Sequence, residues 1–327
     1  MTTPARVTAL APFGLLASET AEAIRVGLTT RPLRLPFECF YDDVGSALFE
    51  AITFLPEYGL SRAERRVLER SRHAIAERLQ PPIEAVELGS GSGRTTRPLL
   101  EALARRGATR YHPVDISAAA LAECRRQMDG IAGLAVRPFE GTHADGLAAA
   151  AAQRAPGSTL LVLFLGSNIG NFERPQALSF LREVRSRLKP VDFLLLGADL
   201  VKPAPALLAA YDDAAGVTAA FNRNALVRLN RELEADFDPK AFEHRALYVP
   251  HARRVEMHLV AKAPQVVRVR ALDLALRLDA GETIWTESSC KFLPGEPWRM
   301  GEQSGFLPVG EWTDSAWPFS LSLIAAA

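Results

Sequence analysis

The segment IEAVELGSGSG, residues 83–93, decides the fold of this chain because it joins an apolar strand to a glycine-rich turn. Residues 83–88 are predicted to form the strand, and Leu99, Leu100 and Leu103 mark a helix after the turn. Glycine lets the backbone turn sharply at this point and come close to a bound ligand. The segment therefore predicts a strand–turn–helix unit with a ligand site at its turn.

Strands and helices alternate on both sides of this unit. Before it, a helix is expected from Arg62 to Leu79, with Ser61 and Glu64 as a capping box. After it, we expect a strand at 111–114 that ends at Asp115, a helix capped by Ser117 and running through Met128, strands at 134–136 and 160–165, a helix at 177–188 and a strand at 193–196. The alternation predicts an α/β fold with a doubly wound parallel sheet.

The pattern changes after Asp199. A helix is expected at 221–233, and the segments 255–259, 267–269 and 274–278 alternate apolar and polar residues, as strands with one face in water do. We therefore expect three parts: residues 1–200 with an N-terminal helical segment and the ligand-binding domain, 201–284 as an inserted α+β lobe, and 285–327 as a return to the first domain. Within the last part, the alternation at 319–323 predicts an edge strand of the main sheet.

Charge and cysteine content exclude several classes of function. Lys plus Arg and Asp plus Glu number 38 each, so no net charge draws the protein to nucleic acid or to an anionic membrane. The three cysteines (Cys39, Cys124 and Cys290) lie far apart, which suits a reducing cytoplasm and gives neither a disulfide framework nor a thiolate metal site. We expect a cytoplasmic protein that holds no metal and acts on a small molecule.

Two apolar stretches do not change this expectation. Arg6 precedes an uncharged stretch at 7–18 that faintly resembles a signal peptide, but Pro12 and Gly14 interrupt it and no clear cleavage site follows. The most apolar internal run, residues 159–166, is too short to span a bilayer. We expect neither export nor membrane insertion.

The residues around the turn indicate which ligand binds there. Asp115 ends the next strand, where its carboxylate can accept hydrogen bonds from both hydroxyls of a ribose, so an adenosine cofactor is expected. The third glycine comes one residue earlier than in the dinucleotide pattern GxGxxG, and Glu87 precedes the first glycine. A carboxylate there repels pyrophosphate but suits a sulfonium and an ammonium group. This favours S-adenosyl-L-methionine over NAD, although an NAD-dependent oxidoreductase and a catalytically silent cofactor sensor remain alternatives.

Several longer motifs resemble one family of enzymes. They occur in the family's order from about Leu35 to the C-terminus: FYDDVGS at 40–46, LPEY at 55–58, GSNIGN at 166–171, AYDD at 210–213, FNRN at 221–224 and TESS at 286–289. These segments are similar to the histidine Nα-methyltransferases of the ergothioneine pathway. The resemblance implies a Rossmann-like class I methyltransferase sheet with an inserted α+β substrate lobe, and three successive methylations of L-histidine to the betaine hercynine, with S-adenosyl-L-homocysteine as the other product.

The resemblance also implies roles for individual residues. Tyr58 and the pair Glu287 and Ser289 would hold the imidazole, Asn171 and Tyr211 the amino and carboxylate groups, Tyr41 would lie beside the amine, and Met257 would close the pocket. Asn171 and Tyr41 would be the catalytic pair. The residues implied to bind the cofactor are Glu87, Gly89, Gly91, Thr95, Asp115, Thr142, His143 and Gly166.

The residue types suit these roles. Asn171 follows a parallel strand at the carboxyl edge, where open α/β sheets bind ligands. Its amide can accept a hydrogen bond from an amine and donate one to a carboxylate. Glu287 and Ser289 are two residues apart on an extended segment, so both point to one face.

Three features depart from the family's pattern. Thr95 stands where the family often has Lys, Thr142-His143 replaces an acid–aromatic pair expected near the adenine, and Gly59 follows LPEY where a second Tyr is usual. The first two put the details of adenine recognition in doubt. The third leaves room for another side chain, so an amine such as tryptophan remains an alternative substrate. We expect a monomer.

Overall fold

A computed structural model describes residues 18–326 of the chain. The signal-like stretch at 7–18 lies outside these residues, apart from Ser18, which begins the first helix. Among the described residues, no helix has both the length and the apolar character needed to cross a membrane.

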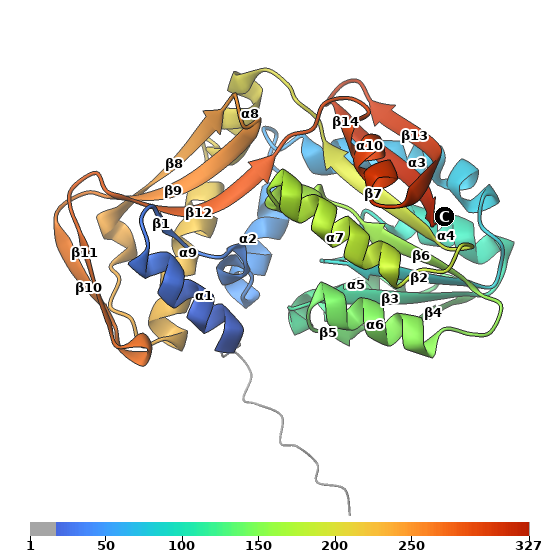
Figure 1. Cartoon of the computed structure of the whole chain (residues 1–327), viewed down its shortest axis with the longest axis horizontal. Coiled ribbons are helices and arrows are strands. Elements are labelled where there is room, and N and C mark those ends of the chain that lie inside the picture. Colours follow the sequence, from blue (N-terminus) through green and yellow to red (C-terminus); the bar gives the residue numbers. More distant parts are fainter. Residues whose placement is uncertain (1–17, 327) are drawn as a thin grey trace, which may run out of the picture.

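The larger of two main sheets has eight strands and dominates one half of the molecule (Figure 1). Its strands are β2 (Ile83–Leu88), β3 (Thr109–Asp115), β4 (Leu134–Val136), β5 (Phe139–Glu140), β6 (Thr159–Phe164), β7 (Phe193–Asp199), β13 (Phe306–Asp314) and β14 (Phe319–Ala326). The order is β13-β14-β7-β6-β2-β3-β4, with β5 also paired to β3. Strands β2 to β7 are parallel, and β14 runs antiparallel to both of its neighbours.

Helices cover both faces of this sheet because its central strands are apolar on both sides. The helices are α3 (Leu60–Glu77), α4 (Arg97–Arg106) and α5 (Ala118–Met128) on one face, and α6 (His143–Gln153), α7 (Arg174–Ser186) and α10 (Glu296–Gln303) on the other. In β6, Leu161 and Leu163 pack toward the first group, whereas Val162 and Phe164 pack toward the second. This is the predicted doubly wound α/β architecture.

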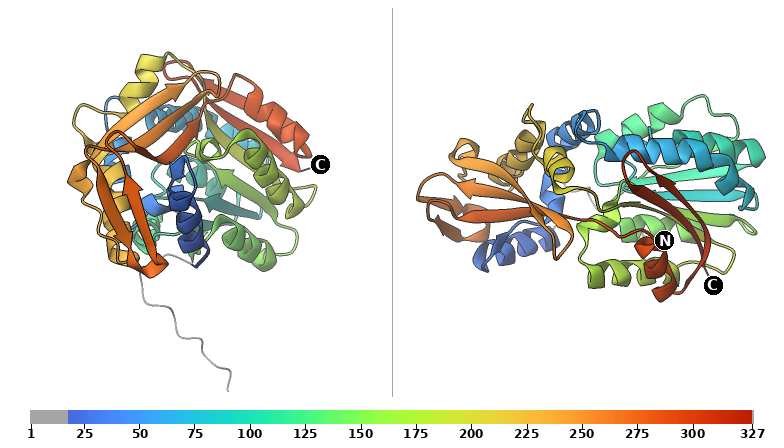
Figure 2. Two further views of the ribbon diagram at one scale, coloured as in Figure 1. Left: turned by 60° about the vertical axis from the view of Figure 1, so that its left-hand side comes forward. Right: turned by 90° about the horizontal axis from the view of Figure 1, so that it is seen from above.

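The second half is a lobe built on a four-stranded sheet with the order β1-β12-β9-β8, beside a hairpin of β10 and β11 (Figure 2). Its strands are β1 (Leu33–Arg34), β8 (Phe242–Val249), β9 (Arg254–Ala261), β10 (Gln265–Val269), β11 (Leu274–Leu278) and β12 (Thr283–Cys290). The remaining elements are α1 (Ser18–Thr29), α2 (Asp43–Thr53), α8 (Ala204–Tyr211), α9 (Val217–Glu232) and the short 3-10 helices η1 (Phe37–Phe40), η2 (Asn168–Asn171), η3 (Pro239–Ala241) and η4 (Arg270–Leu272).

The sheet pairing differs from the expected division of the chain. β12 stays in the lobe's sheet as far as Cys290, and β1 joins it from the N-terminal side, in parallel with β12. The lobe therefore draws strands from both sides of the 201–284 segment, because a parallel partner for β12 has to come from a distant part of the chain. We propose that the return to the main sheet begins after Cys290.

Two local predictions are wrong. Ser61 does not cap α3: the helix begins at Leu60 after Gly59 without a side-chain cap, and Glu64 is buried. The strand at 319–323 rejoins the main sheet as predicted, but it is not the edge. β14 lies between β7 and β13, because the hairpin formed with β13 covers its outer side, and six of its first seven residues are buried.

Candidate active site

The glycine turn after β2 is held in place by the neighbouring strand. The backbone N–H groups of Gly89 and Ser90 donate to the Val114 carbonyl at 2.8 and 3.1 Å. Gly89 and Gly91 have φ angles of +77° and +52°, a region that side chains with a Cβ rarely adopt. A Cβ on Gly89 would lie 2.9 Å from the Asn168 side-chain nitrogen, whereas one on Gly91 would meet no protein atom within 4 Å. The turn thus leaves open space directly above Gly91.

Two carboxylates flank this turn. Asp115, at the end of β3, accepts from the N–H groups of Gly91 at 2.9 Å and Ser117 at 3.0 Å. Glu87, at the end of β2, accepts from the Thr96 hydroxyl at 2.5 Å and from the Tyr111 hydroxyl. Burial raises the pKa of Glu87 to about 7, against the effect of these two hydrogen bonds. Both oxygens of Glu87 are therefore occupied from within the protein.

A cavity of about 550 Å³ opens over the turn, between the large sheet and the lobe. Eleven predicted site residues line it: Tyr41, Tyr58, Glu87, Gly89, Gly91, Thr95, Asp115, Thr142, His143, Gly166 and Asn171. Its other lining carboxylates are Glu38, Asp43, Glu50, Glu64 and Glu123, and Arg94 is the sole Lys or Arg among the described lining residues. Such a cavity attracts a cation and repels a pyrophosphate. Its charge and its glycine cradle fit S-adenosylmethionine.

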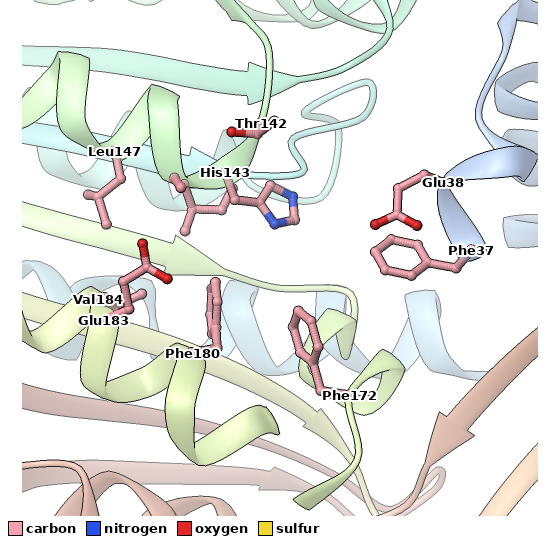
Figure 3. A pocket seen from close by; sticks show the side chains of 11 residues that line it. Phe37, Glu38, Thr142, His143, Leu147, Phe172, Phe180, Glu183 and Val184 are labelled. Atoms are coloured by element: carbon pink, nitrogen blue, oxygen red, sulfur yellow. The ribbon is translucent and has the colours of Figure 1, made fainter. Parts of the chain in front are cut away.

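A smaller cavity of about 210 Å³ adjoins the first and shares Phe37, Glu38, Thr142, His143 and Phe172 with it. Figure 3 shows the His143 imidazole projecting from the start of α6 toward Phe37 and Glu38, with the ring of Phe172 to one side. Burial lowers the pKa of His143 to about 4, so the ring is neutral at pH 7. Thr142 caps α6: its hydroxyl accepts from the Asp145 N–H at 3.2 Å. The surroundings suit a flat apolar ring.

The other predicted substrate residues lie behind Tyr58, on the lobe side. The rings of Tyr58 and Tyr211 are 6.3 Å apart, edge to face, and the Tyr211 hydroxyl donates to Ser289 Oγ at 2.7 Å. Met257 pairs with Glu287 across β9 and β12, next to a β-bulge at Thr286. Neither Tyr211, Met257, Glu287 nor Ser289 is among the residues lining the cavity over the turn, so they form an adjoining second group.

The charges of the second group act on the first. Burial raises the pKa of Glu287 to about 7, with Lys291 opposing the shift. Burial, together with the nearby Glu287 carboxylate, raises the pKa of Tyr41 well above its usual range. Tyr41 is therefore a neutral phenol at every physiological pH, placed between the cavity and the lobe.

Sequence reasoning missed a buried polar cluster behind the second group. Lys291 is fully buried, and its ammonium donates to the Tyr211 and Ser289 oxygens, both at 2.9 Å. It also pairs with Asp199 Oδ2 at 2.9 Å, while Lys202 pairs with Oδ1 at 2.6 Å. Burial alone would raise the pKa of Asp199, but the two lysines hold it below its usual range.

One signal in the sequence could have identified Lys291. It follows Glu287 and Ser289 at the same spacing of two residues, so an extended segment points all three to one face. Nothing comparable marks Glu64, because its partner Gly166 lies 102 residues away in sequence.

The sheet order, the glycine turn and the acid-lined cavity define the class of this protein: a Rossmann-like methyltransferase dependent on S-adenosylmethionine. A family profile described as "Histidine-specific methyltransferase, SAM-dependent" matches residues 20–326. The chain therefore belongs to the histidine-specific, S-adenosylmethionine-dependent methyltransferase family. This membership decides between the two cofactors in favour of S-adenosylmethionine and against NAD.

Curated relatives agree with the family assignment. The chain is 44% identical over 301 residues to the histidine N-alpha-methyltransferase of Mycobacterium tuberculosis, covering 91% of this chain and 92% of the relative. It is 43% identical over 318 residues to the enzyme of the same name from Mycolicibacterium smegmatis, covering 94% and 97%. A 4-dimethylallyltryptophan N-methyltransferase from Claviceps purpurea is 32% identical over 169 residues, about half of each chain (50% and 48%).

Proposed function

We propose that this enzyme transfers methyl groups from S-adenosylmethionine to the α-amine of L-histidine and forms trimethylhistidine (hercynine) for ergothioneine biosynthesis. The observation that carries the proposal is the placement of Glu287 and Ser289 on one face of β12, where Ser289 contacts Tyr211, whose ring lies against Tyr58 of the cofactor cavity. Relatives that span nearly the whole chain support the same substrate.

The hydrogen-bonding capacity of this pair matches an imidazole. A neutral imidazole offers one N–H donor and one nitrogen acceptor. Glu287 supplies an acceptor. Ser289 Oγ already accepts from Tyr211 and Lys291, so its own hydroxyl proton is left to donate.

The same capacity argues against an indole. An indole has one donor and no acceptor, so it would leave the buried Ser289 hydroxyl without a partner, a loss of about 1–3 kcal/mol. This difference favours histidine over tryptophan as the substrate.

The substrate's amine and carboxylate are assigned to Asn171 and Tyr211. Asn171 ends η2 at the carboxyl edge of β6 and lines the cofactor cavity. Tyr211 has a single hydroxyl proton, which it donates to Ser289. A carboxylate bound at Tyr211 therefore competes with Ser289 for that proton, and the Asn171 NH₂ is the freer donor.

Bound S-adenosylmethionine supplies a methyl group activated by its sulfonium charge. The residues of this chain contribute mainly by holding the amine in line with that methyl, and such positioning is worth about 7–11 kcal/mol. The amine has to be neutral to react. Burial disfavours its ammonium form and acts against the attraction of the carboxylates that line the cavity. Tyr41, as a neutral phenol, relays the released proton: its oxygen accepts that proton while its own hydroxyl proton passes to water.

The test is a competition among amino acids. The protein is mixed with S-adenosylmethionine and all twenty amino acids, and the methylated products are identified by mass. We expect mono-, di- and trimethylhistidine and no other product. Methylated tryptophan as the main product would contradict the proposal.

A variant sharpens this test. Glu287→Ala is expected to reduce the preference for histidine while S-adenosylmethionine binding is retained. An unchanged preference for histidine would contradict the assignment of Glu287 to the imidazole site.

We also propose that the enzyme acts as a monomer in the cytoplasm. Its three cysteines are free and buried, which suits a reducing compartment. Light scattering after gel filtration should give a mass near 35.6 kDa, and twice that mass would contradict the monomer.

A further inference from the structure

Glu64 is a buried carboxylate with one oxygen left over. It lies on α3, is 4% exposed, and its Oε1 accepts from the Gly166 N–H at 2.7 Å. A Cβ on Gly197 would lie 2.7 Å from the same oxygen, so the main sheet closes off that side. Within residues 18–326, Oε2 has no hydrogen-bond or ion-pair partner, and Glu64 lines the cofactor cavity.

No Lys or Arg of the described residues pairs with Glu64, so nothing in the protein compensates its ionised form and the side chain is mostly protonated at pH 7 until a cation binds. Burial raises its pKa to about 8, and the carboxylates of Glu87 and Asp199 add to the effect, while the Gly166 N–H opposes it. Lys202 and Lys291, the two lysines of the buried cluster, both pair with Asp199. A carboxylate buried with a single N–H partner is unfavourable unless a cation joins it.

Glu87, which precedes the glycine turn, is a poorer partner for a cation. Thr96 and Tyr111 each donate to one of its two oxygens. Glu64 reaches the same cavity from α3, and its Oε2 accepts no hydrogen bond from the described residues. The two acids therefore differ in role, although both are buried and both line the cavity.

We propose that Glu64 binds the α-ammonium of the cofactor's methionyl group through Oε2, while Oε1 holds the Gly166 turn. The cofactor brings two cationic groups, and only the ammonium can donate hydrogen bonds to a carboxylate. The proposal rests on S-adenosylmethionine as the cofactor and not on histidine as the substrate, so it can be tested without any amino acid.

The test compares three ligands by titration calorimetry. S-adenosylhomocysteine keeps the α-ammonium, its deaminated analogue lacks only that group, and 5′-methylthioadenosine lacks the whole amino-acid part. With the unaltered protein, loss of the ammonium is expected to weaken binding by about tenfold or more, the value of one charge-assisted hydrogen bond. Equal binding of S-adenosylhomocysteine and the deaminated analogue would overturn the proposal without recourse to any variant.

The variant Glu64→Gln keeps the shape of the side chain and removes its charge. We expect this variant to bind S-adenosylhomocysteine about tenfold or more weakly than the unaltered protein does. Its affinity for 5′-methylthioadenosine should change by less than about threefold. The deaminated analogue should bind this variant as it binds the unaltered protein. If the affinities of all three ligands fall by the same factor, Glu64 only supports the Gly166 turn and the proposal is wrong.

Glu123→Gln is the matched control. Glu123 lines the same cavity, but Gln127 and Arg126 already donate to its two oxygens. We expect the affinity of this variant for every ligand to change by less than about threefold, because the substitution removes no free carboxylate oxygen. An effect as large as that of Glu64→Gln would assign the result to the general charge of the cavity and contradict a specific contact.

Discussion

Replacement of Lys291 by methionine removes the ammonium at the centre of the buried cluster. Methionine preserves most of the volume of the side chain, so the change is mainly the loss of charge and of three donors. Lys291 is fully buried and pairs with Asp199 at 2.9 Å. Breaking a buried ion pair by removing one partner generally costs about 3–5 kcal/mol.

The structure places this variant near the lower end of that range. Asp199 keeps two other partners, Lys202 at 2.6 Å and the Trp317 indole N–H at 3.0 Å, so its charge is not left alone. We expect Lys291→Met to lower the free energy of unfolding by about 3 kcal/mol. Since Tyr211 and Ser289 lose a donor, the KM for histidine should also rise while S-adenosylhomocysteine affinity is retained.

Urea unfolding followed by tryptophan fluorescence measures the stability. Lys240→Met, at an exposed lysine of η3, is the control and should stay within about 0.5 kcal/mol of the unaltered protein. The double variant Lys291→Met/Asp199→Asn should lose less free energy of unfolding than the two single variants lose together, by about 1 kcal/mol or more. A Lys291→Met protein within about 1 kcal/mol of wild type, or strictly additive effects, would refute the ion-pair reasoning.

Three further predictions concern single residues of the site. Burial raises the pKa of Glu287 from 4.5 to about 7 in the folded protein, so its ionisation destabilises the fold as pH rises through that window; Glu287→Gln should therefore be more stable than wild type at pH 8, by on the order of 1–3 kcal/mol, with no gain at pH 4. Thermal unfolding at both pH values checks this, and a larger gain in stability at pH 4 than at pH 8 would contradict the prediction. Gly91→Ala and Gly157→Ala should each cost about 1–2 kcal/mol, because both glycines have positive φ and open space at Cβ, but calorimetry should show weaker S-adenosylhomocysteine binding for Gly91→Ala alone. Tyr41→Phe should slow each methylation by about tenfold or more, measured by product mass over time; wild-type rates across pH would exclude the proton relay.

The sequence predicted the main sheet well because its signals are local. The continuous apolar run at 160–165 predicted a strand buried on both faces, which the structure confirms as β6, and Ser117 caps α5 with its own hydroxyl, accepting from Ala120 N–H at 3.2 Å. The glycine turn is equally local, since positive φ at Gly89 and Gly91 follows from residue type and position. These features needed no knowledge of distant residues.

Local rules failed where a distant segment competed for the same group. Glu64 stands at the spacing of a capping box after Ser61, yet it bonds to Gly166, which is 102 residues away in sequence. The alternation at 319–323 is equally compatible with an edge strand, and only pairing with β13 makes β14 internal.

The amino-acid sequence alone determined the class of fold, the position of the cofactor turn and the family, because periodicity, glycine and ordered motifs are properties of the chain itself. The tertiary structure alone decided which carboxylates remain free. Glu87 and Glu64 are the same residue type, each buried at the same cavity, but Thr96 and Tyr111 occupy one while the other keeps an open oxygen. The difference arises because hydrogen-bond capacity is used up by whichever donors the fold brings within reach.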